Sequence, residues 1–392
     1  MIAPEKLLEA AKALEPQLQE WRRTLHRHPE VGFDLPQTKA LVKKALTEMG
    51  YTPQDCGKCG VVALAGGKRP GKVILLRGDM DALPLQEESG EEFSSELPGK
   101  MHGCGHDMHT AMVLGAAKLL KEHEDEIEGT VKLEFQPAEE IFQGSLDMIN
   151  SGLLENPKVD AAFALHIFST TPVGEVTYCT GVTSSSLDSF IVNIQGKGGH
   201  SSTPQLSIDP LMIANQIYTA ANMLMTREVD PKATATLSAG VLRSGTAVNI
   251  LPDTATLQMG MRTYDKEARA HILERLPQII DHYVKAWRGD YELVTFNCPC
   301  TYTDDTVSHE LLPAIAEIVG EENISNTGPM AGTEDFSYVA EAVPSMFICL
   351  GAGGPDQYPH HNPRMVLDES VFFQGAAIHA NCAMEWLNKH GK

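Results

Sequence analysis

The sequence predicts an α/β protein whose mixed, largely parallel sheet carries helices on both faces, with a smaller α+β domain inserted into it. Short apolar runs that end in polar residues alternate with stretches of helical periodicity over most of the chain. The middle of the chain shows instead a β-α-β-β-α-β order, which is typical of a ferredoxin-like fold. The length of 392 residues exceeds one ordinary compact core and fits this division.

Helical spacing is clearest at the N-terminus. Apolar residues recur there every three or four positions, at Leu7, Ala11, Leu14, Leu18, Trp21 and Leu25. This spacing predicts one helical face and a first helix that ends before His26-Arg-His-Pro29. Residues 38–49 predict a second helix.

Buried strands are predicted where apolar runs end in polar side chains. The runs are residues 73–76, 131–135, 161–165 and 346–350, with a helix expected over 110–121. In parallel α/β sheets, ligands gather at the carboxyl ends of the strands. The Asp, Glu and His residues that follow these runs are therefore candidate site residues.

Residues 186–297 are predicted to form the inserted domain, which leaves 1–185 and 298–392 as the two parts of the larger domain. The inserted strands are expected at 190–195, 234–241, 254–262 and 291–296. One helix is expected to begin at Asp209-Pro210, since Asp caps helix N-termini and Pro fits the first turn. A second helix is expected over residues 266–287.

The composition argues against several classes of protein. A formal net charge of -21 disfavours nucleic acid and anionic membranes as partners. No apolar run approaches the roughly 18 residues that a membrane helix needs. The N-terminus lacks the pattern of a signal peptide, so a cytoplasmic location is predicted.

The eight cysteines are too sparse for a disulfide framework. Cys56-Gly-Lys-Cys59 and Cys298-Pro-Cys300 have spacings that suit metal or redox chemistry. Nothing local brings four ligands together at either pair, so their role stays open.

The segment Met101–His109 concentrates soft metal ligands. Cys104 and His106 stand two residues apart, just before a predicted helix. Thiolate and imidazole suit Zn, Co, Ni or Mn, and the flanking glycines at 103 and 105 let the backbone fold tightly around an ion. A Cys-Gly-His sequence also occurs in ordinary loops, so the assignment depends on ligands from other strand ends.

Such ligands follow the neighbouring strands. Glu139 and Glu140 are adjacent carboxylates after Pro137, where two like charges repel unless a cation lies between them. One can bind metal while the other serves as a general base. His166 is predicted to end the next strand, and His361 lies in a loop bounded by prolines.

Taken together, these motifs resemble the amidohydrolase branch of the M20 metallopeptidase family, which contains aminoacylases, hippurate hydrolases, auxin-conjugate hydrolases and N-acetyldiaminopimelate deacetylases. The resemblance runs nearly end to end. It rests on the motifs at residues 25–30, 77–84, 101–107, 135–140, 164–166, 196–200, 249–252, 332–336 and 361–363.

The resemblance implies a paired-metal catalytic domain with Glu139 as the general base. The implied ligands are Cys104, His106, Glu140, His166 and His361. Asp81 matches the aspartate that orients a ligand imidazole. Most relatives outside this branch carry His-x-Asp where this chain has Asp79-Met-Asp81, so Cys104 is expected to compensate for the missing His. Whether Asp79 is structural or shares the role of Asp81 stays open, as does a ligand role for His109.

For the inserted domain, the resemblance implies a dimerisation and lid role. His200 would reach the active site of a partner subunit and stabilise the oxyanion, and Asn249 and Arg262 would bind the substrate carboxylate. The planar guanidinium of Arg suits a carboxylate because it binds both oxygens at once. Ile141-Phe142 stand where the branch usually has a glycine-rich stretch, and they are expected to narrow the acyl pocket.

The expected function is hydrolysis of N-acyl-L-amino acids by a homodimer with two divalent ions per subunit, Zn, Mn, Co or Ni. A dipeptidase or aminopeptidase using the same site is the first alternative. A non-catalytic metal-binding relative is the second, and the presence of both ligands and base speaks against it.

Overall fold

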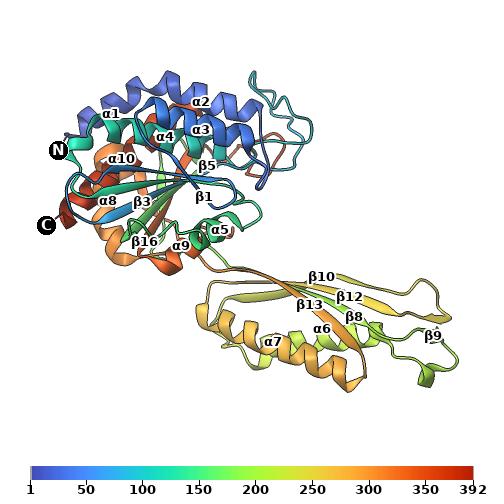
Figure 1. The fold of residues 1–392 in the computed structure, drawn as a ribbon. Coiled ribbons are helices and arrows are strands. Elements are labelled where there is room, and N and C mark those ends of the chain that lie inside the picture. The colour runs from blue at the N-terminus through green and yellow to red at the C-terminus, as the bar shows by residue number, and fades with distance from the viewer. Residues whose placement is uncertain (1, 392) are drawn as a thin grey trace. The chain divides into compact units, whose positions relative to one another are not determined.

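The computed structural model describes residues 2–391, which form two compact units (Figure 1). The smaller unit consists of Ser184–Cys300 and Met330–Thr333, and the rest of the described chain forms the larger unit. The chain thus leaves the larger unit after Thr183, returns at Thr301, and contributes one further short segment to the smaller unit. Residues 186–297, the expected insertion, all lie within the smaller unit.

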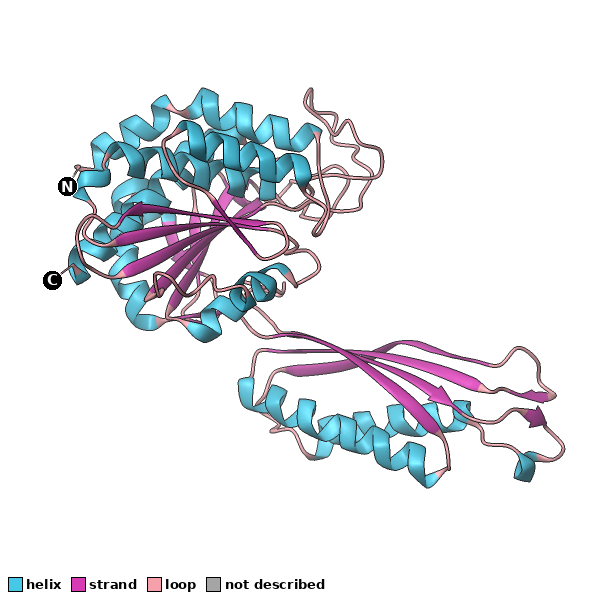
Figure 2. Ribbon diagram, viewed as in Figure 1, coloured by secondary structure: helices cyan, strands magenta, loops and turns pink. Residues whose placement is uncertain are grey.

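An eight-stranded mixed sheet forms the centre of the larger unit (Figure 2). Its order is β1-β2-β4-β3-β5-β16-β6-β15. The strands are β1 (Gln54–Cys56), β2 (Gly60–Gly66), β3 (Val73–Asp79), β4 (Thr130–Gln136), β5 (Ala161–Pro172), β6 (Val176–Tyr178), β15 (Ile324–Asn326) and β16 (Ser345–Gly353). The central strands β4, β3, β5 and β16 run parallel to one another. The predicted α/β class with a largely parallel sheet is confirmed.

Helices cover both faces of this sheet, with α1 to α4 on one face and α5 and α9 on the other (Figure 1). The helices of the larger unit are α1 (Pro4–Ala13), α2 (Glu15–Arg27), α3 (Pro36–Glu48), α4 (His106–Glu122), α5 (Gly144–Asn150), α8 (Asp305–Val319), α9 (Ser337–Ala342) and α10 (Phe372–His390). Short elements complete it: η1 (Glu124–Glu126), η3 (Glu321–Asn323), η4 (Glu369–Val371), and β7 (Gly181–Val182) paired with β14 (Tyr302–Thr303).

The N-terminal helix differs from the prediction because it is broken at Leu14. Leu14 ends α1 and precedes α2, whose first turn contains Pro16. Proline has no backbone N–H and its ring crowds the preceding helical turn, which favours a break at this position. Leu7, Ala11 and Leu18 are nevertheless all fully buried, so the apolar face continues across the break.

The central helix α4 positions the first candidate ligands. It is buried along almost its whole length and packs on β3 in the main apolar core. Its N-cap Gly105 has a φ of 88°, and an added Cβ would lie 2.4 Å from Cγ2 of Ile167. Only glycine fits here, and this close approach fixes the start of α4 beside β5.

The smaller unit is a four-stranded antiparallel sheet of order β10-β12-β8-β13 that packs with two helices. Its elements are β8 (Leu187–Gln195), β9 (Gly199–His200), η2 (Pro204–Leu206), α6 (Pro210–Arg227), β10 (Ala235–Ser244), β11 (Ile250–Leu251), β12 (Thr254–Thr263), α7 (Lys266–Ala286) and β13 (Asp290–Cys298). The β-α-β-β-α-β order is as expected. Asp209 caps α6 by accepting the N–H groups of Leu211 and Met212.

All eight cysteines lie in the described chain and none forms a disulfide. Cys56 donates to the carbonyl of Met148 and Cys300 to that of Thr263. Among residues 2–391, the clusters of potential metal ligands include neither Cys-x-x-Cys nor Cys-x-Cys pair. No helix in this range has the length and apolarity to cross a lipid bilayer.

The buried carboxyl of Glu134 on β4 makes the stability of the folded protein depend on pH. Neither of its carboxyl oxygens has a hydrogen-bond partner, and burial raises its pKa to about 8 although Arg77 opposes the effect. The folded state therefore holds this proton more tightly than the unfolded state, and stability falls as the pH rises from the ordinary glutamate pKa to about 8.

Glu134→Gln should consequently raise the melting temperature by a few degrees at pH 8 and leave it unchanged at pH 4, since about 1 kcal/mol shifts the midpoint by roughly 2–4 °C. The other buried carboxyls titrate in both proteins and cancel in the difference. Exposed Glu48→Gln, measured alongside by thermal unfolding, should show no such pH dependence. A Glu134→Gln difference that is equal at both pH values would contradict the assignment.

Candidate active site

Three neighbouring strands bring the polar side chains of the larger unit together. β3 ends at Asp79, and β4 ends at Gln136 and leads into the loop 137–143. His166 lies within β5, which continues to Pro172, so the prediction that His166 ends its strand is wrong. The strand continues because β16 pairs with it in parallel well beyond this position.

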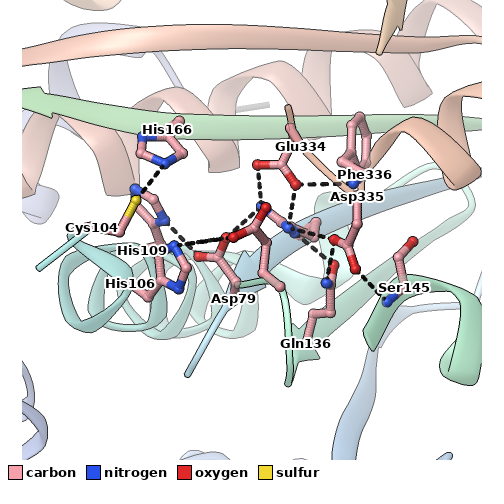
Figure 3. Close-up of polar contacts among 12 residues, drawn as sticks. Asp79, Cys104, His106, His109, Gln136, Ser145, His166, Glu334, Asp335 and Phe336 are labelled. Atoms are coloured by element: carbon pink, nitrogen blue, oxygen red, sulfur yellow. Dashed lines mark hydrogen bonds and ion pairs between the residues drawn. The ribbon is translucent and has the colours of Figure 1, made fainter. Parts of the chain in front are cut away.

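Five side chains expected to bind metal fall into interlocking groups. Cys104 with His106 and His166, Cys104 with Glu140 and His361, and His106 with Glu139 and Glu140 each place one ligand atom per residue within 4.8 Å of the others. They come from the segment before α4, the first residue of α4, the loop after β4, strand β5 and the loop after β16. Figure 3 shows Cys104, His106, His109 and His166 gathered on one side of Asp79.

The state of His166 suits a metal ligand. Its Nδ1 lies 2.6 Å from the carbonyl oxygen of Ile167 and donates to it, which leaves Nε2 as an acceptor 3.6 Å from Sγ of Cys104. Burial, together with His109 and His360, holds the pKa of His166 well below its usual range. A neutral imidazole oriented by a carbonyl is the form that binds metal.

His106 has no hydrogen-bond partner at either ring nitrogen although it is fully buried. Its Nε2 lies 3.6 Å from Asp79 Oδ2 and 3.8 Å from a carboxyl oxygen of each of Glu139 and Glu140. Burial alone would lower its pKa, but Asp79, Asp81 and Glu140 raise it to about 10. The local field thus attracts positive charge, and the donor set of thiol, imidazole and carboxylate fits a divalent metal ion.

His361 reaches the same region from a constrained loop. Its Nε2 lies 3.3 Å from Oε2 of Glu140, and its N–H donates to the carbonyl of Gly103 over 2.8 Å. Its φ of 63° is unusual for a residue with a side chain and is held by this backbone contact. The loop therefore presents His361 to the Cys104 segment.

Asp79 and Asp81 make different contacts. Asp79 accepts from Nδ1 of His109 at 2.6 Å and pairs with Arg77 at 2.6 Å. Burial would raise the pKa of Asp79, but Arg77, His106 and His109 hold it well below its usual range. Asp81 accepts the N–H groups of Glu139 at 2.9 Å and Glu140 at 3.2 Å, and lies 3.5 Å from Nδ1 of His106. Asp81 thus contacts both the candidate base and a candidate ligand.

Two other histidines of the segment have separate environments. His109 is saturated, because Nδ1 contacts Asp79 and Nε2 accepts the N–H of Ile167 at 2.8 Å. Asp79, His106 and His109 lie close enough together to form one further ligand group, but both nitrogens of His109 already have these partners. His102 is buried with both ring nitrogens unpartnered, and in the described chain it belongs to none of the ligand groups.

Glu139 is surrounded by other carboxyls. Burial, followed by Glu334, Glu140 and Asp335, raises the pKa of Glu139 well above its usual range. A general base must be ionised before it accepts a proton, so Glu139 can serve as one only where nearby cations offset these charges. Glu139, Glu334 and Asp335 themselves lie within 4.8 Å of one another.

Sequence reasoning missed Arg77, Glu334 and Asp335 as part of this site. Arg77 is fully buried and contacts Glu334 Oε1 at 2.6 Å and Asp335 Oδ1 at 3.3 Å. All three lie in the motifs at residues 77–84 and 332–336, and the adjacent acids of the second motif were a further signal, since charged residues are seldom buried without a partner.

The residue expected to stabilise the oxyanion, His200, and the two expected to bind substrate, Asn249 and Arg262, all lie in the smaller unit. His200 is exposed, and its Nδ1 accepts from the N–H of Ser202 at 3.1 Å. Asn249 is exposed on the segment before β11. Arg262 donates to the hydroxyls of Thr333 at 2.8 Å and Ser185 at 3.4 Å.

Comparison with known proteins identifies the family. The sequence pattern of peptidase family M20/M25/M40 matches residues 75–385. The chain belongs to this family. It is 34% identical to N-acetylcysteine deacetylase of Bacillus subtilis over 96% of this chain and 98% of that protein. It is also 34% identical to thermostable carboxypeptidase 2 of Saccharolobus solfataricus, over 98% and 99% of the two chains.

Among solved structures, the YXEP protein of Bacillus subtilis, described as a dinuclear metal binding peptidase of the M20 family, superposes with a TM-score of 0.79 at 32% identity. The match covers 96% of this chain and 99% of that one. Its family and these relatives identify this M20 protein as a metal-dependent hydrolase.

Removal of single histidines tests the ligand groups. His106→Ala should lower the metal bound per chain, measured by emission spectrometry after reconstitution and desalting, because His106 belongs to three of the groups. His102→Ala is the matched control, since it removes a buried, unpartnered histidine of the same segment, and it should keep the wild-type metal content. Equal metal loss in both variants, or in neither, would refute the assignment of His106.

Proposed function

We propose that this protein hydrolyses the amide bond of N-acyl-L-amino acids, with Glu139 as the general base. The observation that carries the proposal is the position of Glu139: a buried carboxyl beside the candidate ligands His106 and Glu140, with its backbone N–H held by Asp81. The deacetylase relative, named for N-acetylcysteine, supports an N-acyl amino acid as the substrate class.

In this proposal Cys104, His106, Glu140, His166 and His361 hold two divalent ions per subunit, drawn from Zn, Mn, Co and Ni. Such ions, when bound, polarise the amide carbonyl and acidify water. The dinuclear relative supports this number. The neutral state of His166 and the lack of other partners at His106 suit these two residues to the role.

The chain's own groups move the proton. Glu139 accepts a proton from the attacking water and then delivers it to the amide nitrogen as the C–N bond breaks, leaving an amine and a carboxylic acid that ionises in water. Asp81 fixes the backbone of Glu139 and Glu140 and faces His106, so it orients base and ligand together. Asp79 is assigned a supporting role through His109 and Arg77.

Recognition of the amino-acid carboxylate is assigned to Arg262 and Asn249. Arg262 contacts two hydroxyls and, in the described chain, no carboxylate, so its charge remains available for a substrate. Because His200 Nδ1 accepts from Ser202, its neutral ring carries the proton on Nε2 and can donate to an oxyanion. The exposed Ile141 is assigned to the acyl pocket.

We further propose a homodimer formed through the smaller unit. Val248 is 99% exposed and Ile250 54% exposed on either side of Asn249. Exposed aliphatic side chains beside a candidate substrate-binding residue favour a surface that a second copy covers.

Peptide hydrolysis on the same site is the second candidate, and the carboxypeptidase relative favours it. Both reactions need a free substrate carboxylate and the same base. They differ at the substrate's other end, where a dipeptide with a free α-amine carries a positive charge.

The wild-type protein, reconstituted in turn with Zn, Mn, Co and Ni, should hydrolyse N-acetyl-L-methionine and hippurate at least about tenfold better, in kcat/KM, than Ala-Gly. The control is Glu139→Gln, which should retain metal and lose at least about 10³-fold in kcat, since the base is absent. Amine release reports on all three substrates.

A preference for Ala-Gly would replace the proposal with a dipeptidase. Retained turnover in Glu139→Gln would remove Glu139 from the mechanism while leaving the substrate class intact.

Mixing two inactive variants tests whether His200 acts in the active site of the partner subunit. His200→Ala and Glu139→Gln should each be impaired as homodimers, but subunit exchange should restore up to about a quarter of the sites, because a hybrid dimer holds one intact combination. A mixture of Glu139→Gln and His106→Ala is the control and should recover nothing. Absence of recovery in the first mixture, with exchange verified by mass spectrometry, would show that His200 does not act across subunits.

A further inference from the structure

The loop 137–143, which carries Glu139 and Glu140, contains backbone angles that residues other than glycine rarely adopt. Ala138 has a φ of 55° and Phe142 a φ of 52°, both in the left-handed region. Such conformations persist only where the surroundings fix them. Asp81 fixes the middle of the loop through the N–H groups of Glu139 and Glu140, and the N–H groups of Gln143 and Gly144 bond to the carbonyl of Ala138 within it.

A single carboxylate contacts both ends. Oδ1 of Asp335 accepts from Nε2 of Gln136 at 2.6 Å, directly before the loop, and Oδ2 accepts the N–H of Ser145 at 3.0 Å, directly after it (Figure 3). Asp335 is fully buried. Gly144 shows how closely the ends approach, since an added Cβ would lie 1.5 Å from the carbonyl oxygen of Pro137.

Asp335 is itself held in place from the other side. Arg77 Nε donates to Oε1 of Gln136 at 2.8 Å, and Arg77 Nη2 lies 3.3 Å from Oδ1 of Asp335. Glu334 accepts from the same guanidinium at 2.6 Å and from the N–H of Phe336 at 2.9 Å. The carboxylate therefore has little freedom to turn away from the loop.

We propose that Asp335 is a positioning residue: its carboxylate ties Gln136 to Ser145 and thereby sets where the loop places Glu139. This inference rests on the proposed role of Glu139 as the base. A misplacement of about 1 Å at a reacting group can cost on the order of 10²-fold in rate, which is the effect expected when the tie is cut.

The amide of Asn cannot replace this carboxylate. Both ends of the loop offer hydrogens to Asp335, and Asn has one acceptor oxygen where Asp has two. Asp335→Asn thus keeps the size of the side chain but can hold only one end. Asp335→Ala holds neither end.

Both variants should lower kcat by about 10²-fold, Ala at least as much as Asn, with KM within about threefold and metal content unchanged under saturating metal. Hydrogen exchange of the amides in residues 137–145 should accelerate in both. Gln136→Leu combined with Asp335→Asn should lose little more than either single variant, since both cut the same tie.

Asp304→Ala is the matched control. Asp304 caps α8 by accepting the N–H groups of Thr306 at 2.9 Å and Val307 at 3.0 Å, so its loss also removes a carboxylate from a helix start in the same unit. It should accelerate exchange at α8 and leave kcat unchanged.

The inference is overturned if both Asp335 variants keep kcat within about threefold of wild type, or if activity falls only in proportion to lost metal. If the wild type cleaves no N-acyl amino acid, the proposed function fails. In that case hydrogen exchange alone tests whether Asp335 holds the loop. Unchanged protection of residues 137–145 in Asp335→Ala would reject the inference.

Discussion

Burial of six carboxyl groups in one small volume is the constraint on which the site depends. They are Asp79, Asp81, Glu139, Glu140, Glu334 and Asp335, and all lie at or near the carboxyl ends of β3 and β4 or in the segment before α9. Like charges away from water are unstable unless cations balance them. Arg77 forms ion pairs with Asp79 and Glu334 and offsets their charge. Glu139 and Glu140 lie in the ligand cluster around His106, which is suited to divalent ions.

The backbone of the larger unit makes this concentration geometrically feasible. Gly105 lets α4 start against β5, and Gly144 lets the loop after β4 close on Pro137. The positive φ of Ala138, Phe142 and His361 shows where the chain departs from relaxed geometry in the two loops that carry Glu139, Glu140 and His361. Strain of this kind is characteristic of functional loops held by rigid neighbours.

Much of this could be predicted from the sequence, because the signals are local. Apolar runs predicted the strands, and the cysteine, histidine and glutamate residues between the predicted elements marked the candidate site. The break at Leu14 could have been predicted from Pro16, because proline disfavours a continuous helix even where the apolar periodicity continues. The contacts of Arg77 with Glu334 and Asp335 join positions 257 and 258 residues apart, and no local pattern reports such pairing. The saturation of His109 likewise depends on the backbone of a distant strand.

The central claim is that this carboxyl-rich site is built around metal ions, and anomalous diffraction tests it most directly. Crystals grown with Mn²⁺ and measured on the low-energy side of the iron edge, where manganese still scatters anomalously, should show one peak beside Cys104, His106 and His166 and a second beside Glu140 and His361. Absence of anomalous density there, in crystals of protein that hydrolyses its substrate at full rate, would contradict the account.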